Sequence, residues 1–171
     1  MKPEFAFIEL ILALGIGIMT VFLSKYVLTK YYLGKKYEAD PYKNTSFMIF
    51  LSGSIFSVCF ILFGIMEPLS STIKLLSANG INFDFFVSIF KYTILFLAIG
   101  YVFSAGIIFI SYKLFSILTK NLDEYEEISK NNIGVAILVS VLTIVIAMFT
   151  KMPFIIFIET LIPYPDVPNL M

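Results

Sequence analysis

Four long apolar stretches dominate this sequence and decide what it can fold into. Each holds about 20 or more mainly apolar residues, the length that an α-helix needs to cross the hydrocarbon core of a bilayer. Helices are expected because a segment in lipid must satisfy its own backbone hydrogen bonds. The predicted spans are 5–28, 47–66, 92–114 (with a start as early as 85 left open) and 132–150.

The composition agrees with a membrane protein. Of the 171 residues, 59% are hydrophobic and 14% are charged, whereas soluble domains average about 45–50% apolar and about 25% charged residues. The net charge is zero, so the basic footprint of a nucleic-acid-binding protein is missing. We therefore expect an all-α, polytopic membrane protein with one four-span domain over residues 1–171, surrounded by membrane lipid and without a nucleic-acid partner.

Several reactive residue types are missing. The chain has no His, Arg or Trp, and its single cysteine, Cys59, lies inside an apolar stretch. The usual neutral-pH acid–base group, the bidentate anion clamp and a cysteine zinc site are therefore excluded. Carboxylates, Lys, Tyr and Ser remain for catalysis. We expect no enzyme activity, no cofactor and no metal site.

The polar connections predict how the spans begin and end. Residues 29–46 form a basic, tyrosine-rich loop, and Asn44 stands where it can cap the second span. Glu67-Pro68 is expected to end that span, and 69–79 to form a short amphipathic helix lying in the membrane interface. The aromatic-rich residues 83–92 are expected at head-group level.

The second polar loop, residues 116–131, is acidic. Lys151-Met152-Pro153 is expected to mark the end of the fourth span or a kink in it. The proline-rich tail, residues 163–171, is expected to be extended. Eight lysines lie in or beside the two polar loops and four lie elsewhere. The positive-inside rule therefore predicts a plasma (inner) membrane protein with both loops in the cytoplasm and both termini outside.

A shift of 88 positions aligns the two halves of the chain. Polar residues match across this shift: Lys25 with Lys113, Tyr37 with Tyr125, Glu38 with Glu126, Asn44 with Asn132 and Ser52 with Ser140. We interpret this as a duplication that makes two parallel two-helix repeats, with chance matching of apolar sequence as the alternative. The predicted organisation is repeat one at 1–68, an interfacial connection at 69–84, repeat two at 85–162 and the tail at 163–171.

Each predicted span contains two small residues four positions apart. The pairs are Ala13 and Gly17, Gly53 and Ser57, Gly100 and Ser104, and Ala136 and Ser140. Such pairs let helix backbones approach closely in lipid, although they also arise by coincidence in sequence of this composition. They predict a compact bundle with one face left for another subunit.

The segment 123–136, with its acidic turn, Glu127-Ile128, two spacers, Asn131-Asn132 and a small-residue helix start, resembles the signature of the YjfL-like bacterial inner-membrane proteins. The resemblance implies an inner-membrane protein of two two-span repeats, with no known activity. Asn131 stands where that family usually has Gly. The first half keeps only Lys43-Asn44 of the pattern.

The polar ends of the spans supply the candidate partner-binding residues. Asn44 and Asn132 are read as helix caps, or as side chains that face each other and bind a partner or an ion. Glu124, Glu126 and Glu127 are read as a solvated helix entry, which the helix dipole favours, or as a docking site for a basic partner. Lys35 and Lys36, in the basic loop, would then pair with this acidic loop.

Inside the spans, charge is scarce. Glu9 and Lys91 lie near span ends, where they can reach the interface or pair with each other. Serine and threonine hydroxyls are the only polar groups deeper in the spans, which argues against a proton relay or a transporter of charged substrates. The candidate intramembrane or helix-packing residues are Glu9, Lys91, Gly17, Gly53, Ser57, Gly100, Ser104 and Ser140.

The sequence favours an integral membrane subunit or scaffold without catalysis of its own. It would form a homo-oligomer or a hetero-oligomeric complex through helix packing and cytoplasmic loops. The alternative is an oligomeric channel or permeation element lined by Ser and Thr hydroxyls. A membrane enzyme comes third, because His and Arg are missing.

Overall fold

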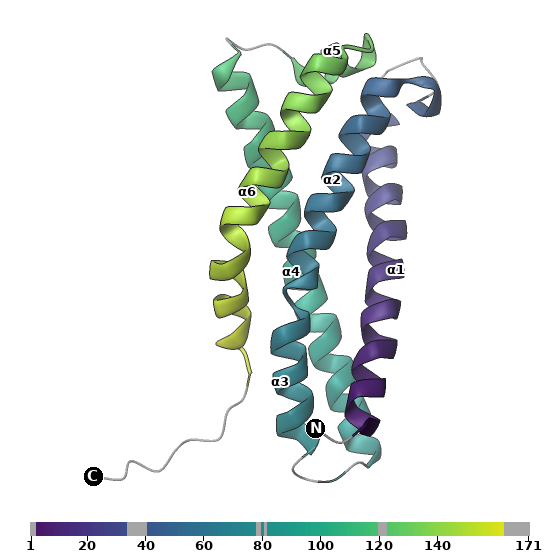
Figure 1. Cartoon of the computed structure of the whole chain (residues 1–171), viewed down its shortest axis with the longest axis vertical. Helices are drawn as coiled ribbons and strands as arrows, with labels where there is room; N and C mark the ends of the chain where they lie inside the picture. Colours follow the sequence, from purple (N-terminus) through teal and green to yellow (C-terminus); the bar gives the residue numbers. More distant parts are fainter. Residues whose placement is uncertain (1–2, 34–40, 78–79, 81, 120–122, 163–171) are drawn as a thin grey trace, which may run out of the picture.

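The computed structural model confirms the predicted all-α fold. It describes residues 3–33, 41–77, 80, 82–119 and 123–162, with side chains at 6–30, 42–77, 80, 82–119 and 123–162. Within these ranges, four helical segments are long and apolar enough to cross a membrane: Ala6–Lys30, Thr45–Ser77, Phe83–Leu118 and Ile133–Glu159. They form an elongated bundle (Figure 1). The chain is therefore a multi-pass transmembrane protein.

One helix organises the bundle. After α1 (Pro3–Leu33) and the short 3₁₀ turn η1 (Pro41–Lys43), the chain enters α2 (Thr45–Phe63). α2 contacts all three other long helices and packs most extensively against α6 (Ile133–Glu159). α4 (Phe83–Leu118) has 36 residues, which corresponds to a length of about 54 Å at the α-helical rise.

The predicted stop at Glu67-Pro68 is wrong. Pro68 lies in the first turn of α3 (Met66–Ser77), a position that tolerates proline. Since Pro68 has no N–H to donate to the Gly64 carbonyl, the helix breaks at Gly64 and Ile65 and then resumes. The predicted short helix is present, but it continues α2 along nearly the same line instead of turning across the bundle (Figure 1).

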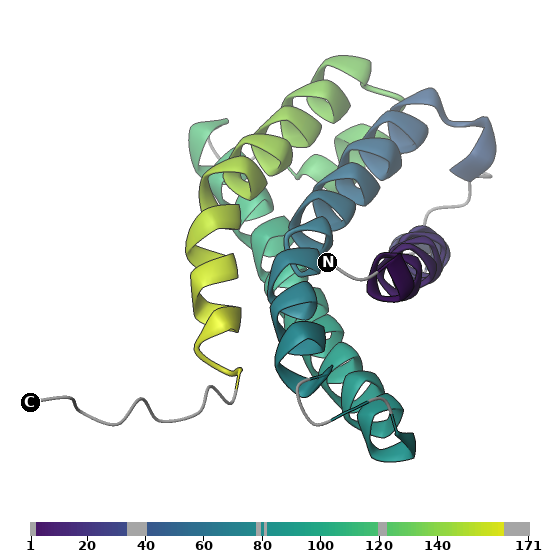
Figure 2. The same ribbon diagram turned by 60° about the horizontal axis from the view of Figure 1, so that its bottom comes forward.

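The fourth span does not end at Pro153. α6 continues through Pro153 to Glu159, so the residues after the proline belong to the same helix. Proline cannot donate to the carbonyl four residues earlier, which weakens the helix on one side. Figure 2 shows α6 changing direction where green gives way to yellow. The kink is therefore the correct alternative, and the predicted helix end is wrong.

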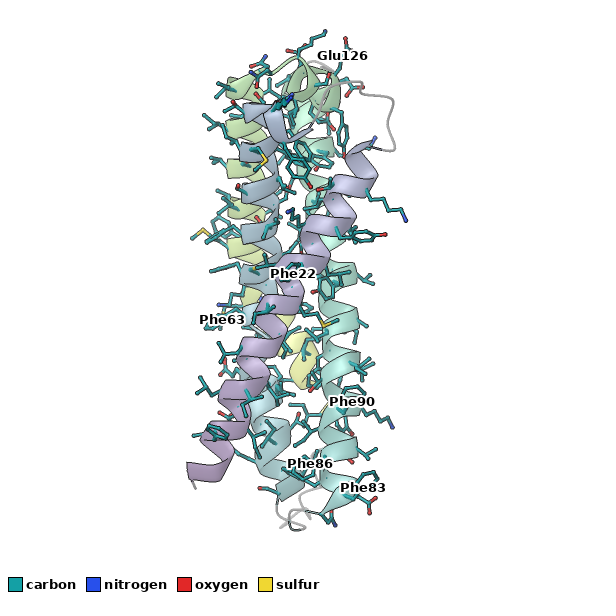
Figure 3. All side chains as sticks on the ribbon, turned by 90° about the vertical axis from the view of Figure 1, so that its right-hand side faces the viewer. Phe22, Phe63, Phe83, Phe86, Phe90 and Glu126 are labelled. Atoms are coloured by element: carbon teal, nitrogen blue, oxygen red, sulfur yellow. The ribbon has the colours of Figure 1, made fainter. Side chains whose placement is uncertain are left out.

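The outer surface of the bundle is apolar. Phe22, Phe90 and Phe149 are 69%, 68% and 81% exposed, and Figure 3 shows the first two pointing away from the helices. A monomeric soluble protein rarely exposes apolar surface on this scale, whereas lipid tails cover it without cost. The buried core forms two clusters, of which the smaller gathers Phe47, Phe115 and Ile128 at the end that carries α5 (Glu124–Ser129).

Candidate functional site

The candidate site is a polar corner where α5 meets the start of α6. We call residues 123–132 the α5 corner. It lies at the same end of the bundle as the start of α2 (top of Figure 1). α5 spans Glu124–Ser129 and begins with Asp123, whose carboxylate accepts the backbone N–H groups of Tyr125 and Glu126 at 2.9 and 3.2 Å. The aspartate caps this short helix.

Asn131 turns the chain from α5 into α6. Its φ is +62°, in the left-handed region, which asparagine adopts more readily than most residues. The N–H groups of Asn131 and Asn132 donate to the carbonyls of Ile128 and Glu127, both at 3.0 Å. This pair of bonds is the Schellman motif that closes a helix C-terminus. It explains how Asn can stand where the resembled family has Gly.

Asn44 joins α2 to the α5 corner. Its Oδ1 accepts the Phe47 N–H at 2.9 Å, which is the predicted N-cap. Its Nδ2 donates to the carbonyls of Ile128 at 2.8 Å and Ser129 at 3.1 Å, at the far end of α5. The side chain is buried. One asparagine therefore caps one helix and the end of another that is more than 80 residues away in the chain.

A second bond links the same two elements in the other direction. The Ser46 backbone N–H, which is free in the first turn of α2, donates to Asn131 Oδ1 at 3.0 Å. Asn44 and Asn131 thus form a reciprocal clamp between α2 and the α5 corner. The sequence analysis did not predict that Asn131 contacts α2. The feature that pointed to it is Asn at a position where the resembled family usually has Gly.

Asn132 acts only locally. Its Oδ1 accepts the Val135 N–H at 3.3 Å, which confirms the predicted cap of α6. Its Nδ2 donates to the Glu127 carboxylate at 2.8 Å. The residue is exposed. Asn44 and Asn132 thus share the capping role, but only Asn44 reaches across to another part of the fold.

The acidic residues of the corner fall into two environments. Glu126 is 58% exposed and Glu127 is 25% exposed, and their carboxylates lie 2.6 and 3.6 Å from the Lys130 ammonium. Glu126 above all, with a smaller contribution from Glu127, raises the pKa of Lys130 above its ordinary value. Glu124 is instead buried at 9% exposure. The predicted exposed patch therefore consists of Glu126 and Glu127, with Asp123 beside them, and lacks Glu124.

The corner stays negative despite its lysine. Residues 123–130 hold four carboxylates and one ammonium, a formal charge of −3. Nowhere in the described ranges do three or more His, Cys, Asp or Glu side chains group closely enough to hold a metal ion. Lys35 and Lys36, the predicted partners of this loop, lie outside the described residues, so the pairing of the two loops stays a prediction.

The glycines of the small-residue pairs have different surroundings. A Cβ placed on Gly53 would lie 2.5 Å from Ser140 Cβ, so α2 and α6 touch here. A Cβ on Gly100 would meet the flexible ends of Leu62 and Ile65, whereas one on Gly17 would meet nothing within 4 Å. The Gly53 and Ser140 positions are thus close helix-packing positions, and Gly17 is open.

The hydroxyls inside the spans also differ. Ser57 donates to the Gly53 carbonyl at 2.9 Å, and Ser140 donates to the Ile49 carbonyl of α2 at 3.3 Å. Ser104 is buried, and its oxygen has no hydrogen-bond partner in the part of the chain that the structure describes. Two of these three predicted residues therefore bond to backbone within the bundle.

The charges near the other end of the bundle do not pair with each other. Glu9 accepts a hydrogen bond from the Ser70 hydroxyl of α3 at 2.7 Å. Lys91 is exposed, and the described residues contain no Glu9–Lys91 ion pair. The sequence analysis did not predict the contacts of Lys151. Its ammonium lies 4.5 and 5.0 Å from the ring centres of Phe60 and Phe63. Such contacts accommodate a cation near apolar surface.

The chain matches the model of a known protein family. The family described as Domain of Unknown Function (DUF350) matches residues 4–153. This range covers α1 to α4, the α5 corner and α6 as far as its proline. No curated protein and no solved structure matches the chain.

Proposed function

We propose that this chain, which belongs to the DUF350 family, is an integral membrane subunit that docks a partner at the α5 corner and has no catalysis of its own. The observation that carries this proposal is the Asn44–Asn131 clamp. It fixes an exposed acidic turn on the most densely packed part of the bundle.

A clamped corner suits docking because its shape exists before the partner arrives. α5 has six residues, far too few to form a stable helix alone. The clamp, together with the burial of Tyr125 and Ile128 at 8% and 0% exposure, holds it in place. A surface that is already ordered loses little conformational entropy on binding, which favours a specific partner.

The charge of the corner favours a basic partner. Glu126 and Glu127 are exposed to different degrees, and Lys130 balances only part of their charge. Complementary charge speeds association and excludes like-charged surfaces. The same acidic surface is repelled by an anionic leaflet, so it would stand away from the lipid and face a protein.

The same proposal includes the two-repeat family group, the membrane and orientation of the chain, and the kind of partner. Membership of a two-repeat, YjfL-like group is supported by Asn44 and Asn132, which cap α2 and α6 at positions 88 apart. The lysine distribution supports a plasma (inner) membrane protein with the α5 corner in the cytoplasm and both termini outside. The partner is then a larger cytoplasmic or membrane protein, in a homo-oligomeric or hetero-oligomeric complex.

The alternative of an oligomeric, hydroxyl-lined channel has no specific observation in its favour. Ser57 and Ser140 bond to backbone carbonyls within the bundle. Both residues are also buried within this chain, at 2% and 6% exposure, so they do not face the outer surface, where a pore between copies would form.

The test compares two pairs of carboxylates. The intact chain is cross-linked in membranes, purified in mild detergent and examined for a partner in fixed proportion. Glu126→Gln with Glu127→Gln should release that partner, and raised salt should do the same. Glu67→Gln with Asp84→Asn, two exposed carboxylates in the first turns of α3 and α4, is the matched control and should retain it. A wild-type chain that is always a lone monomer overturns the proposal, as does equal loss of partner in both double variants.

A further inference from the structure

A cavity of about 380 Å³ opens between α1 and α4. α1 packs against α2 and α3 and hardly touches α4, so the two helices leave space between them. Figure 3 looks onto this side of the molecule, where α1 runs diagonally across the view and α4 lies beside it. Val58 of α2 and Tyr125 of the α5 corner also line the space.

The cavity wall is almost wholly apolar and carries no charged side chain. Apart from the hydroxyls of two serines and three tyrosines, it is lined by apolar side chains such as those of Leu23, Val27 and Ile108. A charge without a partner in such surroundings is strongly disfavoured. An occupant therefore has to be uncharged where it lies against this wall.

The depth of the cavity leads to the same conclusion. Ser104 lies 14 residues before the end of α4 at Leu118, about 21 Å along the helix axis. This distance places Ser104 inside the apolar span, whereas Tyr125 at the polar α5 corner lines the same cavity. A ligand that reaches Ser104 must therefore be an apolar molecule that dissolves in the membrane core.

Two serine hydroxyls at this cavity lack a partner. Ser24 and Ser104 are 5% and 3% exposed, and neither has a hydrogen bond to any residue that the structure describes. Other buried serines differ among themselves. Ser57 of α2 and Ser111 of α4 donate to the carbonyl four residues earlier, at 2.9 and 2.8 Å, whereas Ser46 and Ser54 of α2 have no partner among the described residues.

The unpartnered hydroxyls call for an oxygen-bearing ligand. Buried polar groups are nearly always hydrogen-bonded, and each exception requires an explanation. Water is scarce in a bilayer core, so an oxygen atom of a ligand in the cavity is a partner that Ser24 and Ser104 can take. A serine hydroxyl can turn about χ1 among staggered positions, which lets Ser24 on α1 and Ser104 on α4 reach into the space between their helices.

We propose that this cavity binds a neutral membrane amphiphile, an apolar chain or ring whose carbonyl or hydroxyl oxygen hydrogen-bonds to Ser24 and Ser104. It enters from the bilayer between α1 and α4. The volume falls within the range of about 300–1,000 Å³ that ligand sites occupy. A quinone ring and an uncharged glyceride share this chemistry. This site is separate from the proposed docking at the α5 corner.

The test measures binding to the intact protein in detergent micelles by native mass spectrometry. Four probes are compared: a short-chain quinone, dioctanoylglycerol, a plain hydrocarbon of similar size and the anionic lipid phosphatidylglycerol. At least one of the two neutral oxygen-bearing probes should bind more tightly than the hydrocarbon and the anionic lipid. Which of the two binds identifies the source of the ligand. Equal binding of all four probes, or binding of neither neutral oxygen-bearing probe, overturns the proposal.

Substitutions then test whether the molecule binds in this cavity. Ala105→Phe fills the cavity from an exposed position on α4 and should abolish binding, whereas Val102→Phe, 75% exposed on the same helix and outside the cavity, should not. Ser104→Ala keeps the space and removes one hydroxyl, so the oxygen-bearing probe should bind about 3- to 10-fold more weakly with hydrocarbon binding unchanged. Unchanged thermal unfolding shows that each variant is folded. Tight binding to folded Ala105→Phe overturns the assignment.

Discussion

Gly53 and Gly17 belong to the same kind of sequence pair, yet they lie in opposite surroundings. At Gly53, α2 and α6 approach so closely that a Cβ would lie 2.5 Å from Ser140 Cβ. At Gly17, on α1, a Cβ would meet nothing within 4 Å. A pair of small residues therefore permits close packing between helices but does not bring it about.

The difference extends to the two sides of α2. On the α6 side, the helices are packed closely and Asn44 and Asn131 clamp their ends. On the α1 side, a cavity of about 310 Å³ lies against Gly17 and Cys59, in addition to the cavity beside α4. We call these the closed side and the open side. The closed side holds the fold together, and the open side leaves room for a ligand or another subunit.

The largest expected effect tests the clamp on the closed side. Asn44→Ala removes the cap of α2 and leaves the carbonyls of Ile128 and Ser129 without their donor. We expect it to lower the free energy of unfolding by about 2–4 kcal/mol, because both losses add. Asn132→Ala loses an exposed cap and should cost only about 1 kcal/mol. Thermal or denaturant unfolding followed by circular dichroism measures both. Equal effects would show that Asn44 is merely another cap.

The next effect compares the two glycines directly. Gly53→Ala should lower the free energy of unfolding by about 1–3 kcal/mol through overpacking against Ser140. Gly17→Ala should leave it unchanged or raise it by up to about 1 kcal/mol, because alanine favours the helix. The same unfolding measurement applies, and the rate at which a maleimide labels Cys59 reports whether α1 has moved. A destabilising Gly17→Ala would mean that the open side is closed in the membrane.

A smaller effect separates the two roles of Asn131. Asn131→Ala loses the bond to the Ser46 N–H and places a less suitable residue at positive φ, so it should cost about 1–2 kcal/mol of stability. Asn131→Gly loses the same bond but favours that backbone conformation, so its net effect should be close to zero. Because both variants lose the side-chain bond, the difference between the two measured changes gives the cost of the positive φ. A costly Asn131→Gly and a harmless Asn131→Ala would contradict this account.

The smallest effect concerns the ion pairs of Lys130. Because Glu126 and then Glu127 raise the pKa of Lys130, these pairs favour the folded state below the ordinary lysine pKa. The contribution is lost as the pH rises through the raised pKa. Lys130 is well exposed, and exposed pairs contribute little. Lys130→Gln should therefore leave the unfolding temperature at pH 7 unchanged. A clear drop in the unfolding temperature would show that the ion pairs of Lys130 also stabilise the fold.

Local patterns determined most of the secondary structure. The four spans follow from length and apolar composition, and the caps at Asn44 and Asn132 follow from residue type beside an apolar stretch. Each of these features depends on residues within a few turns of one another. The same local reasoning went wrong at Pro68 and left a helix end and a kink open at Pro153, because the cost of a missing N–H depends on what the surrounding packing can absorb.

Only the tertiary structure decided where these local elements meet. Asn44 could be read from the sequence as a cap, but its donation to Ile128 and Ser129 depends on how α5 folds against α2. The burial of Glu124, the contact of Gly53 with Ser140 and the space beside Ser24 and Ser104 are likewise set by long-range packing. In a chain this rich in apolar residues, many helix faces are equally able to pack, so shape and buried hydrogen bonds select among them.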